Sequence, residues 1–543
     1  MSGNRNTLMG CSLGGVLLAL LALHSLPQSS EGSNILGVFT SHSPSHFIVH
    51  MSIMKTLAEK GHNVTVVSSV PPKVTHKSIK HIVLPLRDED EKMIHGGMVD
   101  MVKQKPSIWT TMKSILGSLS LLINTQVDTL EDKRFTDLYN NKDNKFDVLF
   151  VGFFFNTYQV GLGAKFNCPL IISWMSPPLS MVNELIGNPE LSSVPQMQIS
   201  VAAGKPMNFQ QRVANFFSTA GFGLLGKILD HRYKGFYERL WGDDKNMPSL
   251  ETAKKNVSLV FCNSHGISEG PVRPNVPAII EIGGIQVKSK PDPLPEDIKE
   301  FMDNAKNGAI LFSLGSNLKA EYFKPEVVST IYKTLSSLKQ RVIWKWEDPK
   351  NTPGKSANIL YKKWLPQDDI LAHPKLKLFI THAGKGGMAE AQYHGVPMLA
   401  LPVFADQPGN ADKIVENGYG LRLELTSLDV KEFKEAINEI VNNPKYAKKV
   451  QTFSKLYRDR PQTPQESVVY WTEYVIRHHG APHMQSPLVH MGIIASNNLD
   501  IYVLVALALY LIFLINKVVW TFLWRKCTGK SKKAPQNKKV KKQ

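Results

Sequence analysis

The chain has 543 residues, enough for two or three domains and a large buried core. Hydrophobic residues make up 43% of it and charged residues 20%, as is usual for a globular protein. The net charge is +18, but nine of the basic residues follow Trp524 with no acid among them, so half of the excess belongs to a terminal tail. This distribution argues against a nucleic-acid-binding face and favours a membrane-related tail.

The N-terminal residues 1–30 contain Arg5 and then a long apolar run, a pattern typical of a cleaved secretory signal, with an uncleaved anchor as the alternative. The body of the chain is then translocated. Four cysteines make no disulfide framework. Cys168 and Cys262, in apolar contexts, could form one bridge or remain two buried thiols.

A strand–helix–strand unit opens the body, with strands at 35–40 and 63–69 and a helix at 47–61. The loop between the first strand and the helix has no glycine fingerprint. No G-x-G-x-x-G follows the first strand of either half, which argues against a dinucleotide oxidoreductase. His46 lies beyond the carboxyl end of the first strand, where open α/β sheets bind ligands, and His42 is its neighbour in the same loop.

Residues 71–140 alternate polar loops with an apolar helix around 115–123 and are expected to shape a binding pocket. Further strands are predicted at 145–156 and 258–264. The apolar run 215–229 is too short and too polar at its ends to span a bilayer. It could dock on a membrane surface, cover a hydrophobic ligand or form an ordinary buried helix.

Residues 283–297 concentrate glycine, proline and charge, and we interpret them as a linker. A second α/β unit follows, and its first strand, at 310–316, ends in Gly315 and Ser316. Its alternation of strands and helices predicts a parallel sheet covered on both faces. The other strands are expected at 341–347, 358–364, 376–380 and 397–403, with a helix at 325–339.

The stretch 379–414 combines a strand, a glycine-rich turn, a short helix, another strand and a polar loop. Gly384, Gly386 and Gly387 leave the backbone open to a ligand, and the first amides of the helix are unpaired donors suited to a phosphate. Their spacing matches neither a Rossmann fingerprint nor a P-loop. Tight packing of strand on helix is the other interpretation of these glycines.

The C-terminal part contains two helices, at 445–461 and 464–480, and then an apolar segment at 501–524 that is long enough to span a bilayer with Lys517 reaching to the interface. The basic tail satisfies the positive-inside rule, which puts the bulk of the chain on the luminal side. Lys539 and Lys541 resemble a lysine-based retrieval signal of the endoplasmic reticulum, or simply strengthen the anchor.

Three motifs carry a family resemblance: the stretch 379–414, WLPQ at 364–367 and FSLGS at 312–316. Together they resemble the signature of the UDP-glycosyltransferases. From about Asn34 to the C-terminus the order of elements is similar to the membrane-bound animal branch, most of all the arthropod type. The resemblance implies an α/β protein of GT-B fold, with two facing Rossmann-like domains, parallel sheets and a C-terminal transmembrane helix.

The expected division of the chain follows from the resemblance and the composition together. The first large domain would bind the acceptor and the second the UDP-sugar. The segments are a signal peptide at 1–30, an N-terminal domain at 31–284, a linker at 285–297, a C-terminal domain at 298–455, helices packing back on the first domain at 456–480, a transmembrane helix at 501–524 and a cytosolic tail at 525–543.

The resemblance implies a donor-binding role for ten residues. Trp364 would stack on uracil, Gln367 would lie by the base and ribose, and Glu390 would bind the ribose hydroxyls, although core packing for the tryptophan and a solvated helix face for the glutamate are the alternatives. The diphosphate would be held by the backbone and by polar side chains, and the sugar by an acid and an amide. The full set is Ser316, Trp364, Gln367, His382, Gly384, Gly386, Gly387, Glu390, Asp406 and Gln407.

The resemblance also implies that His46 takes the proton from an acceptor hydroxyl. Imidazole titrates near pH 6.5, and general-base help of this kind is typically worth about 10² to 10⁴ in rate. The acid that orients this histidine in relatives aligns with Gly152. Asp147 lies five residues earlier, and Asn156 could hold only a neutral imidazole. A non-catalytic member that binds UDP-sugar or a lipophile therefore stays open.

The loop that would bind the diphosphate departs from the family pattern at two places. Ala383 replaces a glycine of close relatives, and Gly386 and Gly387 replace polar side chains. Lys385 supplies compensating charge. Cys262 stands where vertebrate glucuronosyl enzymes tend to have arginine, which favours glucose. The expected activity is inverting hexose transfer from a UDP-sugar to a small lipophilic alcohol, as in detoxification.

No metal cluster is visible, so no metal and no cofactor beyond the UDP-sugar co-substrate is expected. The expected partners are the UDP-sugar, the acceptor, the membrane and further subunits of the same or another chain, but no nucleic acid. The expected location is the endoplasmic reticulum membrane, as a single-pass protein with a luminal body. Asn256 and, less favourably placed, Asn63 match glycosylation acceptors.

Overall fold

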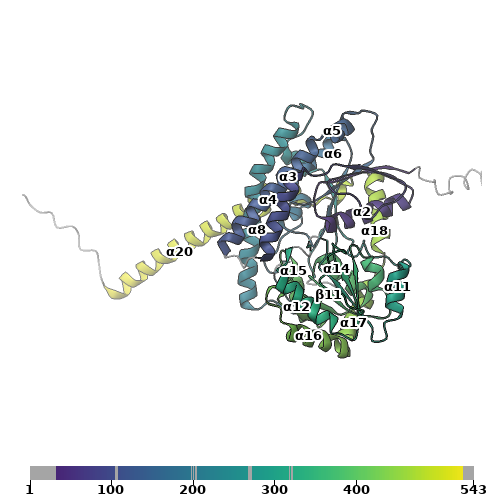
Figure 1. The fold of residues 1–543 in the computed structure, drawn as a ribbon. Helices are drawn as coiled ribbons and strands as arrows, with labels where there is room; N and C mark the ends of the chain where they lie inside the picture. The colour runs from purple at the N-terminus through teal and green to yellow at the C-terminus, as the bar shows by residue number, and fades with distance from the viewer. Residues whose placement is uncertain are drawn as a thin grey trace, which may run out of the picture. The chain divides into compact units, whose positions relative to one another are not determined.

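The computed structural model describes residues 32–103, 108–196, 199, 201, 205–266, 272–316, 318–319 and 322–529. The predicted signal peptide and the tail after residue 529 lie outside these ranges. By its contacts the chain divides into two compact units, Met1–Ser486 and Pro487–Gln543. The first unit holds two parallel sheets, which Figure 1 shows in purple to blue and in teal to green.

The first sheet has seven strands in the order β3-β2-β1-β4-β5-β6-β7, all parallel. Its strands are β1 (Asn34–Phe39), β2 (Asn63–Ser68), β3 (Ile79–Val83), β4 (Val148–Gly152), β5 (Leu170–Trp174), β6 (Val257–Cys262) and β7 (Ile279–Glu281). The helices among them are α2 (Pro44–Glu59), α3 (Asp88–Lys103), α4 (Ile108–Glu131), α5 (Lys133–Asn140), α6 (Gly161–Lys165), α7 (Ser180–Ile186), α8 (Phe209–Trp241) and α9 (Leu250–Lys254).

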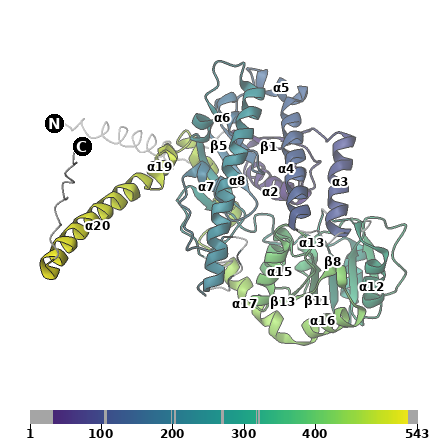
Figure 2. The ribbon, with the colours of Figure 1, turned by 90° about the vertical axis from the view of Figure 1, so that its left-hand side faces the viewer.

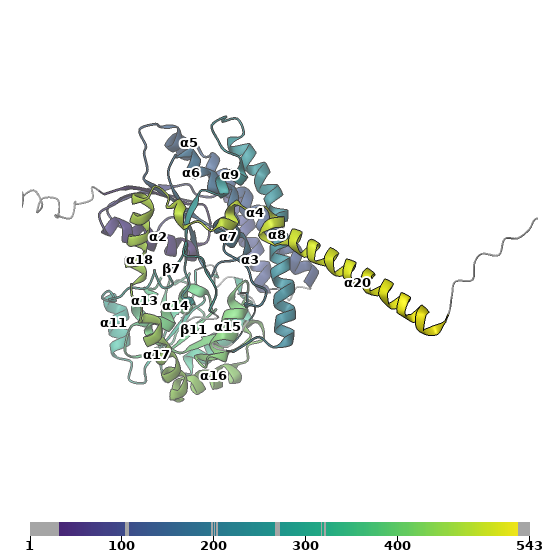
Figure 3. The ribbon, with the colours of Figure 1, turned by 180° about the vertical axis from the view of Figure 1, so that it is seen from behind.

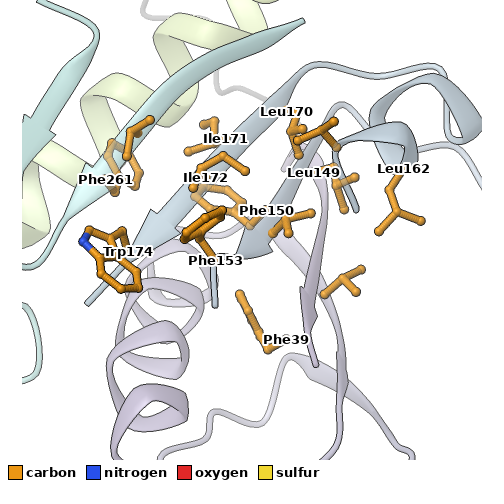
Figure 4. Packing of buried hydrophobic residues seen from close by; sticks show 14 of the residues in the cluster. Phe39, Leu149, Phe150, Phe153, Leu162, Leu170, Ile171, Ile172, Trp174 and Phe261 are labelled. Atoms are coloured by element: carbon orange, nitrogen blue, oxygen red, sulfur yellow. The ribbon is translucent and has the colours of Figure 1, made fainter. Parts of the chain in front are cut away.

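The central strands of this sheet are buried on both faces. All five residues of β4 and all five of β5 are buried, as the continuous apolar runs in their sequences predict for parallel strands covered by helices. Figure 4 shows apolar side chains packed around them, among which the rings of Phe153 and Trp174 lie 5.6 Å apart, centre to centre. This packing holds the ends of β1 and β4 in a fixed relation, which matters for the site below.

The second sheet has six parallel strands in the order β10-β9-β8-β11-β12-β13. They are β8 (Ala309–Ser313), β9 (Arg341–Lys345), β10 (Ile359–Lys362), β11 (Leu376–Thr381), β12 (Met398–Ala400) and β13 (Gly420–Arg422). The helices of this half are α11 (Glu296–Asp303), α12 (Pro325–Ser336), α13 (Gln367–Leu371), α14 (Lys385–His394), α15 (Gln407–Glu416), α16 (Val430–Asn442) and α17 (Pro444–Arg458).

Helix α18 (Pro464–Arg477) returns from the second half to the first. It begins at a capping box in which Thr463 and Glu466 pair each other's backbone amides, and it packs on α2, β4 and β6. Figure 3 shows α17 beside the green second half and α18 beside α2. The expected crossing of the C-terminal helices is therefore seen in α18, whereas α17 packs on α14 of its own half.

The 33-residue helix α8 contains the apolar run 215–229 and continues well beyond it in both directions. Figure 2 shows it, in teal, alongside α4 and α7, which it contacts. One stripe of α8 is exposed and apolar, with Phe217 68% and Leu224 64% accessible. An ordinary buried helix is therefore the wrong interpretation of this run, while the membrane and ligand-covering interpretations stay predictions.

The second unit contains α19 (Ile493–Ser496) and the 30-residue helix α20 (Leu499–Thr528). Among the described residues, α20 is the one helix long and apolar enough to cross a membrane. The predicted span 501–524 lies inside it. The domain boundaries themselves stay predictions, because residues on both sides of the expected linker fall in one compact unit.

Candidate functional site

In both sheets the order of successive strands reverses direction near the middle, and the site residues lie at these two switch points. In the first sheet β1 and β4 are neighbours, and in the second β8 and β11 are neighbours. Open parallel sheets bind ligands at such switch points, beyond the carboxyl ends of the strands. His46 follows β1, and Ser316 and His382 follow β8 and β11. We call the carboxyl ends of β1 and β4 the first-sheet edge, and the carboxyl ends of β8 and β11 the second-sheet edge.

At the second-sheet edge, the ring of His382 lies between two glycines. A Cβ on Gly315 would stand 2.5 Å from its Cε1, and a Cβ on Gly384 would collide with its Nε2. Gly315 also has φ +80°, a conformation that favours glycine. These two glycines therefore serve the packing of the histidine, while Gly386, which has nothing within 4 Å of an added Cβ, borders open space.

Two buried polar atoms at this edge have no hydrogen-bond partner, the Oγ of Ser316 and the Nδ1 of His382. Burial, with a smaller effect of Lys345, lowers the pKa of His382 to about 4. Unpaired buried groups are uncommon and call for an explanation. Here they adjoin the first turn of α14, whose amides point outward with the positive end of the helix dipole, so a polar, anionic ligand would satisfy them together.

Trp364 follows β10 and is 46% exposed, so it is not a core residue. The ammonium group of Lys73, from the loop after β2, lies 5.4 Å from the centre of its ring. Because Lys73 belongs to the first half and Trp364 to the second, this cation–π contact bridges the two halves of the unit. A flat ligand stacked on that face of Trp364 would displace the lysine.

Glu390, on α14, accepts a hydrogen bond from Nε2 of Gln367 at 2.5 Å. Burial, followed by repulsion from the Asp368 carboxylate, raises the pKa of Glu390 to about 8. It is thus not on a solvated helix face. Asp368 is itself held by Nε2 of His394 at 2.7 Å and by the backbone amide of Lys288 in the linker at 2.8 Å.

Asp406 and Gln407 stand at the start of α15. The carboxylate of Asp406 accepts a hydrogen bond from Nδ2 of Asn410 at 2.7 Å, and burial raises its pKa. The side-chain oxygen of Gln407 accepts from the backbone amides of Val403 and Phe404 at 2.9 and 3.0 Å. Gln407 therefore shapes the loop that presents Asp406. The motif alone did not predict this structural role.

Ala383 is strained. It has φ 60° and is fully buried, with its carbonyl bonded to Nδ2 of Asn410 at 3.0 Å. An alanine in the left-handed region costs roughly 1–2 kcal/mol relative to ordinary helical geometry. The backbone of the loop therefore keeps a shape that suits glycine although the side chain is present.

At the first-sheet edge, His46 stands in the first turn of α2, which begins at Pro44. Its ring packs edge-on against Phe154, with centroids 5.0 Å apart, and its Nδ1 is buried without a partner. Burial lowers the pKa of His46 to about 4. The imidazole is therefore neutral at pH 7, with a lone pair free to accept a proton, but it is a weaker base than the free imidazole expected from the sequence.

His42 is not idle in solvent, as a loop histidine usually is. Its Nε2 lies 2.9 Å from Oγ1 of Thr125, and burial lowers its pKa to about 4 against the opposing charge of Asp90. Thr125 belongs to α4, so His42 fastens the loop after β1 to that helix. This anchoring gives His42 a structural role beside His46.

Neither polar residue near β4 is hydrogen-bonded to His46, whose Nδ1 has no partner. Asp147 accepts a hydrogen bond from the amide of Asn34 at 2.7 Å, which places it at the opposite end of the strands. Asn156 donates to the carbonyl of Gly152 at 2.9 Å and accepts from the amide of Phe154 at 2.8 Å. Both ends of the Asn156 amide thus secure the turn after β4, and no hydrogen bond joins Asn156 to His46, whose Nδ1 has no partner.

Other sequence predictions concern residues away from these edges. Cys168 and Cys262 are free thiols, and Cys262 is fully buried at the end of β6. Asn63 and Asn256 are both exposed, Asn63 at the start of β2 and Asn256 just before β6. No group of three potential metal-binding side chains occurs among the described residues.

Solved structures share this architecture. A UDP-glucosyltransferase from Polygonum tinctorium, described as capable of glucosylating indoxyl, superposes with a TM-score of 0.53 at 17% identity, covering 83% of this chain and all of that one. The glycotransferase of kitacinnamycin gives a TM-score of 0.51 at 17% identity, with the same coverage. Two parallel sheets with helices on their faces, together with these neighbours, define a glycosyltransferase fold of the GT-B type.

The family follows from sequence. The model described as "UDP-glucoronosyl and UDP-glucosyl transferase" matches residues 36–534, and the chain belongs to this family. UDP-glucosyltransferase 2 of Dactylopius coccus is 34% identical over 485 residues, 86% of this chain and 89% of that protein. UDP-glucuronosyltransferase 2B15 of Homo sapiens is 29% identical over 509 residues, 90% of this chain and 93% of that protein.

Proposed function

We propose that this protein transfers a hexose, glucose in preference to glucuronic acid, from a UDP-sugar to the hydroxyl of a small lipophilic acceptor. The observation that carries the proposal is the set of unpaired buried polar atoms at both edges, on His46, Ser316 and His382. An acceptor hydroxyl would pair the first and a diphosphate the other two. The exposed Trp364 offers a face for uracil, and Glu390 beside Gln367 offers acceptors and donors for ribose.

In the proposed reaction, His46 removes the proton of the acceptor hydroxyl while the oxygen attacks the anomeric carbon. The bond from that carbon to the diphosphate oxygen breaks, and the electron pair leaves with UDP, so the configuration inverts. His382, Ser316 and the amides at Gly386 and Gly387 meet the charge that builds on the leaving group. Asp406 would bind sugar hydroxyls, held in place by Asn410.

A non-catalytic role is the second candidate, and it is favoured by the lack of a carboxylate beside His46 among the residues that the structure describes. Burial is the one influence on the pKa of this histidine, and no acid opposes it. Without such an acid the protonated ring is poorly stabilised, and in the serine proteases loss of the orienting aspartate lowers turnover by about 10⁴. A protein of this kind would bind UDP-sugar or a lipophile without turning it over.

Turnover by membranes that carry the full chain separates the two candidates. They are incubated with labelled UDP-glucose, UDP-glucuronic acid and a panel of phenols. The proposal expects glucoside formation that falls at least about 100-fold in His46→Ala. The matched control is His231→Ala, which removes an exposed histidine of α8. UDP binding without turnover would instead support the non-catalytic role, and no binding of UDP at all would refute both.

We further propose that the body lies on the luminal side of the endoplasmic reticulum membrane, anchored by α20, whose last turn carries Arg525 and Lys526. Exposure of Asn256 supports its use as a glycosylation acceptor. Treatment of microsomes with a glycosidase would raise the mobility of the wild type and leave Asn256→Gln unchanged. Unchanged mobility of the wild type would contradict this orientation or the use of the site.

A further inference from the structure

Gly152, the last residue of β4, leaves room for an imidazole. A Cβ at this position would stand 2.7 Å from Nε2 of His50 and 2.9 Å from Cδ1 of Phe39, closer than side chains approach in practice. The backbone there is not in a conformation that requires glycine, since no positive φ is found at this residue. The space itself, and not the backbone geometry, therefore requires Gly152.

The imidazole that fills this space is firmly held. His50 is 1% exposed, its Nδ1 lies 2.9 Å from Oγ of Ser173 on β5, and its ring stacks on Phe39 with centroids 4.5 Å apart and planes 2° from parallel. Phe39 of β1, Gly152 of β4 and Ser173 of β5 thus surround the ring of His50. With Nδ1 engaged by Ser173, Nε2 is the nitrogen that faces Gly152.

His50 lies one helical turn from His46 on α2, so the two side chains share one face of the helix, with about 5–6 Å between their Cβ atoms. Burial, followed by the neighbouring His46, lowers the pKa of His50 to about 3. Burial alone acts on His46. Among the described residues, no carboxylate therefore acts on the pKa of His46 or of His50.

We propose that His50 is a positioning residue for the transfer reaction, a neutral hydrogen-bond acceptor that holds protonated His46 in place of an acid. Ser173 fixes its ring, and Gly152 gives it room. The acceptor hydroxyl gives its proton to Nε2 of His46. Nδ1 of His46, which makes no hydrogen bond to His50 in the structure, then donates to Nε2 of His50 after a turn of the His46 ring. After UDP leaves, the proton passes to water. This inference rests on the proposed function.

The steric part is tested by a double-variant cycle on the full-length protein. Gly152→Asp alone should lower the melting temperature by several degrees, because the new Cβ overlaps the ring, and His50→Ala should relieve most of that loss. Gly161→Ala is the control, since its Cβ would stand 2.5 Å from the ring of Tyr237 and 2.7 Å from that of Trp241, both on α8. His50→Ala should not relieve it. Equal stability of Gly152→Asp and wild type would overturn the inference.

The positioning role is tested by titration and by kinetics. Acylation of His46 by diethyl pyrocarbonate, followed by peptide mass spectrometry across pH, gives its pKa without any turnover. In His50→Ala that pKa should fall by about one pH unit, the effect of losing one hydrogen bond to a charged group. In His50→Gln, which keeps an acceptor, it should fall less. An unchanged pKa in both variants would overturn the role of His50.

Kinetics then connect this role to the reaction. His50→Ala should lower kcat about 10-fold or more with KM for the UDP-sugar within about twofold, and adding Gly152→Asp to it should restore kcat. An unchanged kcat in His50→Ala contradicts the inference. Absence of wild-type turnover with every UDP-sugar would defeat the proposed function instead, while the titration of His46 would still decide whether His50 holds its proton.

Discussion

Replacing Glu390 by glutamine separates the stability of the second-sheet edge from its affinity for a nucleotide. In the wild type this carboxyl group is buried, close to Asp368, and bonded to Gln367. Glutamine has nearly the same shape but no charge at any pH. The substitution therefore removes the electrostatic strain while leaving the packing and most of the hydrogen bonding in place.

The magnitude follows from the pKa, which is raised from 4.5 to about 8. The folded protein holds a proton on Glu390 between these values that the unfolded chain has lost, so the free energy of unfolding decreases as pH rises from 4.5 to 8. Each pKa unit is worth about 1.4 kcal/mol, which makes the total on the order of a few kcal/mol. Glu390→Gln should be more stable than wild type above pH 8, and the difference should vanish below pH 4.5.

The affinity should change in the opposite direction. If the carboxylate accepts hydrogen bonds from ribose, glutamine loses a charged acceptor, and UDP should bind about 10-fold more weakly. Binding to the wild type near pH 7 should also release a proton, because the ribose hydroxyls favour the ionised form. The proton appears in calorimetry as a binding enthalpy that depends on the ionisation enthalpy of the buffer.

The assay is thermal unfolding and UDP calorimetry at pH 5 to 9 on wild type, Glu390→Gln and a control. Glu435→Gln is suitable as the control because it removes an exposed glutamate from a helix of the same half, α16. A stability difference that does not depend on pH, or a variant less stable than wild type at pH 8.5, would refute the electrostatic argument. Buffer-independent enthalpies would refute the ribose contact.

Three further substitutions test the second-sheet edge and the contact of Lys73 with Trp364. Ala383→Gly should stabilise the protein by about 1 kcal/mol in denaturant unfolding, because it relieves the φ of 60°, and a loss of stability would contradict this. Gly315→Ala should force the ring of His382 aside and weaken UDP binding measured by calorimetry, whereas unchanged affinity would show that the ring is not needed there. Lys73→Ala should expose the ring of Trp364 and tighten uridine binding, as fluorescence quenching would show; weaker binding would mean that the lysine contacts the nucleotide.

Much of the fold could be predicted because its strands are read directly from apolar runs. The strands β1, β2, β4, β8 and β11 lie where continuous buried residues predicted them. The short β3, β7 and β13 were missed. Only one residue of β3 is buried, and β7 and β13 have three residues each, whereas the equally short β12 lies in the longer apolar run 397–403. Helix α3 was also missed, within the segment whose loops and helices alternate irregularly.

The residues of the site were predicted by motif, but their surroundings were not. The sequence contains His50 four residues after His46, a spacing that puts both on one helix face, yet only the packing of β1, β4 and β5 shows that its ring fills the space at Gly152. The contact of Lys73 with Trp364 joins segments far apart in sequence. Such contacts depend on how the two sheets meet, and no local pattern encodes that.

The return of α18 to the first half means that two stretches of backbone, not one, run between the sheets: the segment after β7 and the segment between α17 and α18. Gln465, at the start of α18, donates to the carbonyls of Ile285 and Val287 and so ties these stretches side by side. A single cut in either would leave the halves joined. Two crossings tied together restrain the separation of the halves more than a single linker would, and favour rotation about these crossings over free separation.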